Sequence, residues 1–198
     1  PRFLHPRQYR KIQDSIRAIM PAFAKVHDAA LADADFRYQF RLNEWEEELV
    51  HADPGFPSSS PTARMDTFFD EQEELWMTEY NAETPAAIAY NDVLTEVFLA
   101  LPVIRAFEKR YDLRPLPARH SMLHTLLDCY RAWGGQEKPR IAILDWHEVP
   151  TYSEFVLFRD YFESHGYECV IADPRDVVYE NGRLYADGRP VHIIYKRV

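Results

Sequence analysis

Several features that point to particular protein classes are scarce in this chain of 198 residues. Its two cysteines, Cys129 and Cys169, are too few for a disulfide framework and have no CxxC spacing, so we expect both to be reduced. Acidic residues outnumber basic ones by 32 to 23, and the net charge of −9 argues against binding to nucleic acids or anionic membranes. The sequence has no long apolar run and no signal-peptide pattern, so we expect a soluble, cytoplasmic protein.

Two common catalytic patterns are absent as well. The residues Trp146-His147-Glu148 follow the first expected parallel strand in place of a GxGxxG turn, so a nucleotide bound in the usual Rossmann manner is not expected. No GxSxG nucleophile elbow occurs, and Cys129 lies in a helical apolar stripe where an inert thiol is expected.

The amino-terminal part of the chain has a helical pattern. Hydrophobic residues make up 46% of the chain and aromatic residues 14%, which predicts a folded protein of one domain or two small ones. In residues 8–50 we expect an apolar helical stripe at which Pro21 either interrupts the first helix or begins a second one. A third helix should run from about Phe36 to His51. Residues 53–62 are rich in proline and serine and predict a loop. We therefore expect a helical region with its loop over residues 1–60.

The carboxyl-terminal part, residues 61–198, alternates strands and helices. A helix over 86–110 with a kink at Pro102 and another over 119–133 precede a predicted strand–helix–strand unit over 141–146, 152–165 and 167–171. A small hairpin near 183–188 and a last strand over 191–195 complete it. We expect an α/β fold of mixed α+β character, with a parallel, Rossmann-like βαβ unit.

A β-hairpin between residues 64 and 85 is the most informative stretch. Aromatic and branched residues form two strand-like runs on either side of the polar segment from Asp70 to Glu74, which predicts a turn. If Asp70 pairs with Leu75 across a loop of about four residues, then Asp66 lies opposite Glu79. The same register places Arg64 opposite Asn81.

Two opposed carboxylates repel each other unless a cation lies between them. The carboxylates of Asp66 and Glu79 and the amide oxygen of Asn81 are oxygen donors of the kind that Mg²⁺ takes when phosphates also hold it. The alternative is a solvated sheet face whose charges only alternate with core residues, because a register slip of one residue separates the groups.

Three other groups of residues are weaker candidates. His120, His124 and Asp128 are spaced to share one helix face and could hold a metal, although packed leucines nearby favour a structural role. Asp145 and His147 end the first parallel strand and would either line a pocket or cap the next helix. Lys196 and Arg197 end the last strand and could reach an anionic substrate.

The hairpin resembles a known family. Arg64-Met65-Asp66 followed by Glu79-Tyr80-Asn81-Ala82-Glu83-Thr84-Pro85 is similar to the pattern R-x-D, then E-Y-N-A-[DE]-[ST]-P, of circularly permuted ATP-grasp proteins of the glutathionylspermidine synthetase type. The segment from Asp187 to Arg197 also looks like the end of the Rossmann-like pre-ATP-grasp domain in such proteins. The resemblance covers roughly residues 60–198, and the helical first 50 residues match no signature of the family.

The resemblance implies roles for individual residues. Asp66, Glu79 and Asn81 match magnesium ligands that bridge the phosphates of ATP, Arg64 matches an arginine at the phosphoryl-transfer site, and Thr84 matches a hydroxyl residue near the acyl substrate. The family activates a carboxylate with ATP, and an amine then attacks the acyl phosphate to form an amide. The lysines and remaining metal ligands of an ATP-grasp domain are missing from this sequence, and so is a cysteine amidase domain.

We therefore expect the amino-terminal part of an ATP-dependent carboxylate–amine ligase, cut before its ATP-grasp domain and inactive alone. Its substrates would be a small-molecule carboxylate and an amine of unknown identity, and Mg²⁺ and ATP would bind the full-length protein rather than this part tightly. Two alternatives remain open. One is a binding or scaffold module that keeps the hairpin without catalysis, and the other is a metal hydrolase built on His120, His124 and Asp128.

Overall fold

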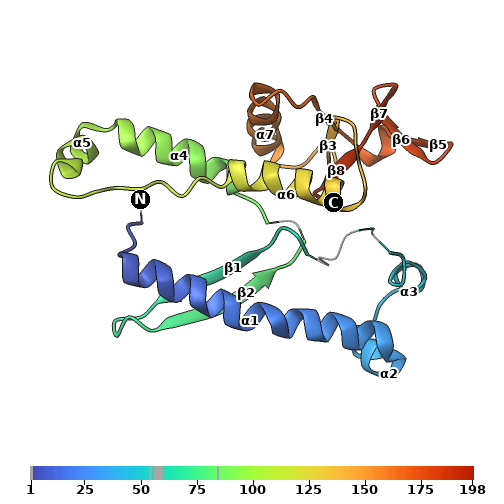
Figure 1. The fold of residues 1–198 in the computed structure, drawn as a ribbon, viewed down its shortest axis with the longest axis horizontal. Coiled ribbons are helices and arrows are strands. Elements are labelled where there is room, and N and C mark those ends of the chain that lie inside the picture. The colour runs from blue at the N-terminus through green and yellow to red at the C-terminus, as the bar shows by residue number, and fades with distance from the viewer. Residues whose placement is uncertain (1, 54, 56–59, 84) are drawn as a thin grey trace. The chain divides into compact units, whose positions relative to one another are not determined.

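The structure is a computed structural model that describes residues 2–53, 55, 60–83 and 85–198, and it mixes helices and strands as expected (Figure 1). The chain divides into two compact units. The described residues of Arg2–Ser60 and Met65–Tyr80 form one, called here the hairpin unit, and those of Pro61–Arg64 and Asn81–Val198 form the other, the sheet unit. This division differs from the expected boundary near residue 60, because most of the hairpin groups with the amino-terminal helices.

The hairpin unit contains one long helix and several short ones. Pro21 lies inside α1, which continues past it, so the expected interruption at this proline is wrong. The expected third helix is broken, because Arg41 adopts a left-handed conformation with φ 51°. The elements are α1 (Pro6–Ala32), α2 (Ala34–Arg37), the 3₁₀ helix η1 (Tyr38–Phe40), α3 (Glu44–Leu49), β1 (Arg64–Phe69) and β2 (Leu75–Asn81).

Contacts along α1 explain why the hairpin groups with it. The ring of Phe23 stacks on that of Tyr80, with centroids 4.1 Å apart. At the other end of the hairpin, Lys11 forms an ion pair with Glu74 at 2.7 Å and donates a hydrogen bond to the carbonyl of Glu73. The helix thus contacts both strand β2 and the turn.

The helices that open the sheet unit are α4 (Ile88–Ala100), α5 (Pro102–Glu108) and α6 (Arg119–Ala132). Pro102 begins a separate helix, where the sequence predicted only a kink. The residue before it, Leu101, is extended with ψ 137°, because a proline ring disfavours the helical conformation of its predecessor. The helix expected over 119–133 is confirmed by α6. None of the described helices combines the length and the apolar character that crossing a bilayer requires.

A parallel three-stranded sheet lies at the centre of the sheet unit. Its strands are β3 (Ile141–Leu144), β4 (Cys169–Ala172) and β8 (Ile193–Lys196), in the order β4-β3-β8. Ile141 stands opposite Cys169 on one side and Ile193 on the other. The helix α7 (Tyr152–Ser164) connects β3 to β4, which confirms the expected βαβ unit.

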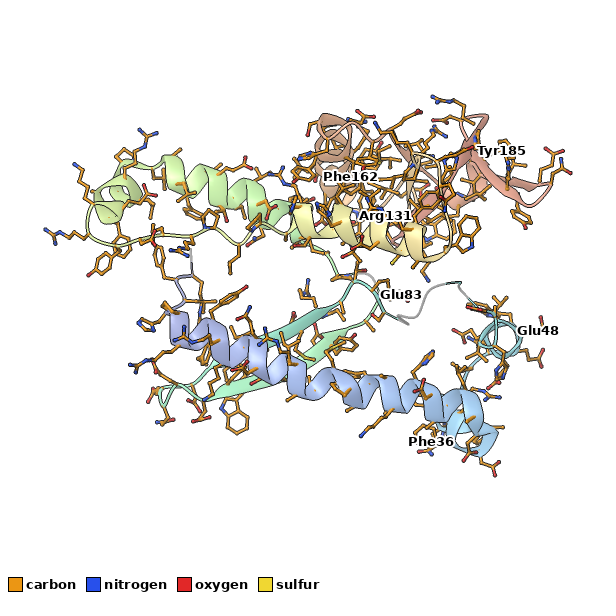
Figure 2. The ribbon with its side chains drawn as sticks, viewed as in Figure 1. Phe36, Glu48, Glu83, Arg131, Phe162 and Tyr185 are labelled. Atoms are coloured by element: carbon orange, nitrogen blue, oxygen red, sulfur yellow. The ribbon has the colours of Figure 1, made fainter. Side chains whose placement is uncertain are left out.

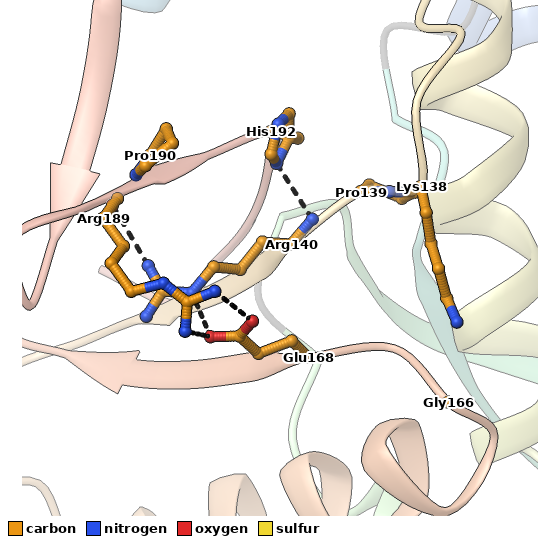
Figure 3. A pocket seen from close by; sticks show the side chains of 8 residues that line it. All are labelled: Lys138, Pro139, Arg140, Gly166, Glu168, Arg189, Pro190 and His192. Atoms are coloured by element: carbon orange, nitrogen blue, oxygen red, sulfur yellow. Dashed lines mark hydrogen bonds and ion pairs between the residues drawn. The ribbon is translucent and has the colours of Figure 1, made fainter.

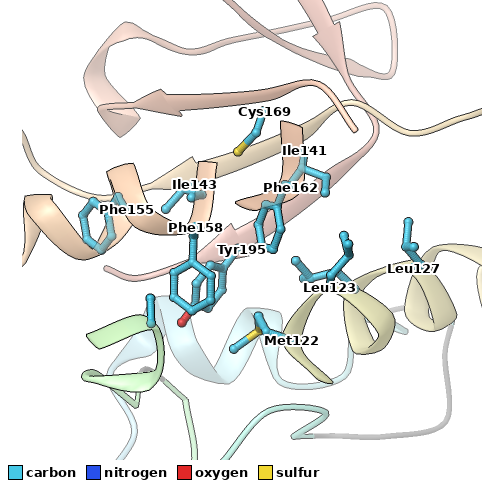
Figure 4. Close-up of a cluster of buried hydrophobic side chains, with 12 residues drawn as sticks. Met122, Leu123, Leu127, Ile141, Ile143, Phe155, Phe158, Phe162, Cys169 and Tyr195 are labelled. Carbon is cyan, nitrogen blue, oxygen red and sulfur yellow. The ribbon is translucent and has the colours of Figure 1, made fainter. Parts of the chain in front are cut away.

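Both faces of this sheet are covered. Helices α6 and α7 pack on one face, where Phe158 and Phe162 are fully buried against Ile143 and Tyr195 (Figures 2 and 4). Residues of β6 and β7 pack on the other face, against Ala142 and Leu144. The covering sheet consists of β5 (Val178–Glu180), β6 (Arg183–Ala186) and β7 (Arg189–Val191), preceded by the 3₁₀ helix η2 (Pro174–Asp176), and β5 was not predicted.

Candidate functional site

The hairpin expected from the sequence is present, and its two strands lie on either side of the segment Asp70–Glu74, as expected. Asp66 lies within β1 and Glu79 within β2, and the two strands pair with each other. Arg64 begins β1 and Asn81 ends β2, both in the sheet unit by the division above. Thr84 lies outside the described residues.

The turn of the hairpin is tighter than expected. The amide of Asp70 donates to the carbonyl of Glu74 at 3.0 Å, so Asp70 pairs with Glu74 and not with Leu75. Glu73 closes the turn in a left-handed conformation, with φ 61°. The expected loop of four residues is therefore wrong by one residue.

The Asp70 side chain organises this turn. Its Oδ1 accepts hydrogen bonds from the amides of Gln72 and Glu74, and its Oδ2 accepts one from the indole of Trp76 at 2.8 Å. The bond from Trp76, followed by the bond from the Glu74 amide, lowers the pKa of Asp70 below its ordinary value. Asp70 thus has a structural role in the hairpin.

The burial pattern along β2 is irregular. Leu75 and Met77 are half-buried and alternate with exposed residues, but Thr78 and Glu79 are both exposed and Tyr80 is half-buried again. The hydroxyl of Thr78 donates a hydrogen bond to the carbonyl of Asp66 at 3.0 Å, so Thr78 lies beside Asp66.

The donors on this hairpin suit a hard cation that other ligands complete. Asp66 is half-buried and Glu79 is exposed. Two carboxylates would fill only part of the octahedral shell of Mg²⁺, which leaves room for phosphate oxygens and water. Among the described residues, no group of three or more His, Cys, Asp or Glu side chains could hold a metal alone.

Arg64 contacts the segment that follows the hairpin. Its Nη1 donates a hydrogen bond to the carbonyl of Ala86 at 2.7 Å, and its side chain is half-buried. This bond ties the start of β1 to the chain just beyond Pro85. The guanidinium therefore lies near the end of the E-Y-N-A-E-T-P segment.

The histidine cluster on α6 does not form the metal site considered from the sequence. The rings of His120 and His124 pack edge to face with centroids 4.3 Å apart. Asp128 accepts a hydrogen bond from Arg131 at 3.0 Å. Within the described part of the chain, these three side chains are not arranged as a group that could hold a metal ion.

Asp145 and His147 serve the loop that follows β3. The carboxylate of Asp145 accepts a hydrogen bond from the amide of Trp146 at 2.8 Å, so Asp145 does not cap helix α7. His147 Nε2 lies 2.9 Å from Asp176 Oδ2. The expected helix cap is therefore wrong, and both side chains make contacts within the loops at this edge of the sheet.

Arg175 fills the neighbouring part of the same edge. Its Nη2 lies 2.6 Å from the fully buried carboxylate of Asp173 and 3.1 Å from Glu148 Oε2, and its guanidinium stacks over Trp146. The hydrogen bonds from Arg175 hold the pKa of Asp173 well below its usual range, and the same pair raises the pKa of Arg175. The carboxyl edge of β3 and β4 is thus occupied by ion pairs of the protein itself.

A pocket that the sequence did not reveal lies at the opposite edge of the sheet (Figure 3). Within it, Glu168 accepts hydrogen bonds from Arg140 at 2.7 Å and from both terminal nitrogens of Arg189. Burial by itself would raise the pKa of Glu168, but these hydrogen bonds hold it below its ordinary value. The pocket has a volume of about 310 Å³ and is lined by Lys138, Pro139, Arg140, Gly166, Glu168, Arg189, Pro190 and His192.

The parallel register assembles this pocket from residues that are distant in sequence. Arg140, Glu168 and His192 each come just before one of the strands β3, β4 and β8. Parallel strands begin at the same edge of a sheet, so the three residues meet there. A single stretch of sequence carries no signal for such a group.

The two cysteines are free thiols, as expected. Burial raises the pKa of Cys169 to about 12 and also raises that of Cys129. At pH 8 only about one Cys169 in 10⁴ would be a thiolate, the form that reacts. We expect a chromogenic disulfide reagent to label half-buried Cys129 slowly in the native protein and Cys169 only after unfolding in urea. Rapid labelling of both thiols before unfolding would contradict this.

Comparison with protein-family models and with curated proteins found no match for this chain. The family resemblance therefore depends on the hairpin residues and on the segment ending at Arg197.

Proposed function

We propose that this chain is the amino-terminal part of an ATP-dependent carboxylate–amine ligase, similar to circularly permuted ATP-grasp proteins of the glutathionylspermidine synthetase type. The observation that carries the proposal is the hairpin, whose paired strands β1 and β2 contain Asp66 and Glu79 within the R-x-D and E-Y-N-A-E-T-P motifs. The reaction transfers the γ-phosphoryl group of ATP to a carboxylate, which releases ADP. An amine then displaces phosphate from the acyl phosphate and forms an amide.

The hairpin residues supply charge and position for the phosphoryl transfer. Such transfers depend mainly on alignment of the reactants and on neutralisation of phosphate charge. Magnesium, when bound, would supply that neutralisation, and Asp66, Glu79 and Asn81 would hold it. Arg64 would stabilise the charge of the phosphoryl group, and Thr84 would lie near the acyl substrate.

The ligands that complete the shell would come from ATP and from residues beyond these 198. Magnesium depends on substrate phosphates in sites with few carboxylates, so the chain by itself should bind the free ion in the millimolar range at best. The free thiols suit a cytoplasmic location, where thiols stay reduced. A small-molecule carboxylate and an amine would be the substrates.

Substitution of Asp66 tests this function. In the full-length protein, Asp66→Ala should reduce Mg²⁺-dependent release of ADP by at least about a hundredfold, because the ion loses a ligand. Glu71→Ala is a matched control, since Glu71 is an exposed acidic residue in the turn of the same hairpin. ADP release would be measured with a coupled assay, and urea unfolding would verify that both variants are folded.

The outcome separates the ligase from the scaffold alternative. A folded Asp66→Ala protein that releases ADP at the unchanged rate would overturn the metal-site assignment. If the full-length protein shows no turnover and no Mg²⁺-dependent ATP binding, the hairpin belongs to a binding or scaffold module.

A further inference from the structure

Two motifs that are far apart in sequence meet at the carboxyl end of strand β8. Arg197 Nη1 donates a hydrogen bond to the carbonyl of Pro85 at 2.6 Å, across 112 sequence positions. Pro85 is the last residue of the E-Y-N-A-E-T-P motif, and Arg197 belongs to the Tyr-Lys-Arg end of the other segment. On the solvent side, Lys196 forms an ion pair with Glu83, a residue of the same motif.

The sequence suggested that Arg197 could reach an anionic substrate, but its side chain is buried within the protein. Its side chain is 4% exposed, and the same Nη1 also contacts the hydroxyl of Tyr195 at 3.0 Å. Its guanidinium lies over the rings of Phe155 and Tyr195, 5.4 Å and 5.5 Å from their centroids. A planar group fixed on several sides defines a position more sharply than a flexible ammonium would.

Glu154 pairs with Arg197 and also contacts the start of helix α4. Its side chain is fully buried, and its Oε2 is 3.5 Å from Arg197 Nη2. Its Oε1 accepts a hydrogen bond from the amide of Ala89, in the first turn of α4, at 3.1 Å. Arg197 and Glu154 therefore hold Pro85 and Ala89, the two ends of the short connection that leads into α4.

The connection between these two points is strained. Ala87 has φ 72°, a left-handed conformation that residues with a Cβ rarely adopt. Such a conformation persists only where the surroundings determine it on both sides. A buried ion pair adds little net stability compared with apolar side chains of the same volume, so its contribution here is mainly one of position.

We propose that Arg197 and Glu154 are positioning residues that fix Pro85, the last residue of the E-Y-N-A-E-T-P motif, and the connection from Pro85 to Ala89. The predicted effect on ATP turnover rests on the proposed function. The predicted effect on local order does not, because it follows from the contacts of Arg197 with Pro85 and of Glu154 with Ala89.

The double variant Glu154→Gln/Arg197→Met separates position from stability. It removes both buried charges, keeps an oxygen that can accept from Ala89, and fills the volume of the arginine stem. We expect it to recover most of the stability that Arg197→Met alone loses, since no unpaired charge stays buried. Amide hydrogen exchange over residues 86–89, measured by mass spectrometry, should nevertheless be about tenfold to a hundredfold faster than in the native protein.

Two further variants keep the test decisive. Lys196→Met removes the neighbouring exposed ion pair with Glu83 and should leave exchange over residues 86–89 close to native. Arg197→Lys keeps the buried charge but has no planar fork, so it should fold and still exchange faster than Lys196→Met. It therefore tests the proposal even if the double variant is unstable. In the full-length protein, ATP turnover of the double variant should fall about tenfold or more.

Native exchange over residues 86–89 in the double variant and in Arg197→Lys would overturn the proposal. Faster exchange with undiminished ATP turnover would also overturn it, provided that Asp66→Ala is inactive in the same assay. If Asp66→Ala keeps full turnover, the proposed function fails, while the exchange measurement still decides the positioning role.

Discussion

The double variant Asp66→Ala/Glu79→Ala should lose no more ATP turnover than the more damaging of its two single variants. Each single substitution is expected to reduce kcat/KM for ATP by about a hundredfold or more, because the magnesium ion loses a ligand. Once one carboxylate is gone and the ion no longer binds productively, the other carboxylate has nothing left to coordinate. The measurement is a double-mutant cycle in the full-length protein at saturating Mg²⁺.

The size of the coupling is what identifies a shared ion. Independent contributions would multiply, so the double variant would lose roughly ten-thousandfold if each single variant loses about a hundredfold. That result would mean that the two carboxylates act at different places, and the magnesium assignment would fail. A cycle between Asp66 and Glu71, the exposed residue in the turn, supplies the reference for uncoupled positions.

The sequence predicted the residue types of the candidate site but not how the hairpin aligns them. Left-handed turn positions are usually signalled by glycine or asparagine, and here the position is held by Glu73. The loop therefore looked one residue longer than it is. The break in alternation at Thr78 and Glu79, which are both exposed, was likewise not visible from residue types alone.

The hydrophobic pattern of the sequence correctly predicted those helices and strands whose limits do not depend on tertiary contacts. Strand β3 has no polar alternation because it is the central strand and both of its faces are buried, and a run of four apolar residues reports this directly. Pro21 was misjudged for the opposite reason. A proline within a helix costs about 3 kcal/mol, but α1 contacts the hairpin on both sides of it, through Lys11 and Phe23.

Helix beginnings were the least visible feature of the sequence. The residues that precede α4 and α6 are Ala87 and Ala118, and neither offers a side-chain cap. The caps come from other helices, since Glu154 of α7 accepts from the first turn of α4 and Asp92 of α4 accepts from the start of α6. Local capping rules cannot detect a partner that only the fold brings near.

Asp92→Ala should therefore destabilise the sheet unit by about 2–4 kcal/mol, far more than a surface substitution would. Asp92 is 7% exposed, and its carboxylate accepts hydrogen bonds from the amides of Ala118 and Arg119 and from the Arg119 side chain. Alanine would leave the first amides of α6 without their acceptor. Urea unfolding followed by circular dichroism at neutral pH would measure the loss.

A second acidic residue on α4 supplies the matched control. Glu96 forms an ion pair with the same Arg119, but its side chain is 66% exposed, so Glu96→Ala should cost less than about 1 kcal/mol. Asp92→Asn should fall between the two, since the amide keeps one acceptor oxygen and loses the charge. Equal losses for Asp92→Ala and Glu96→Ala would show that Arg119 pairing, and not the cap on α6, stabilises this junction. A larger loss at Asp92 would assign the start of α6 to a residue 26 positions earlier in the chain.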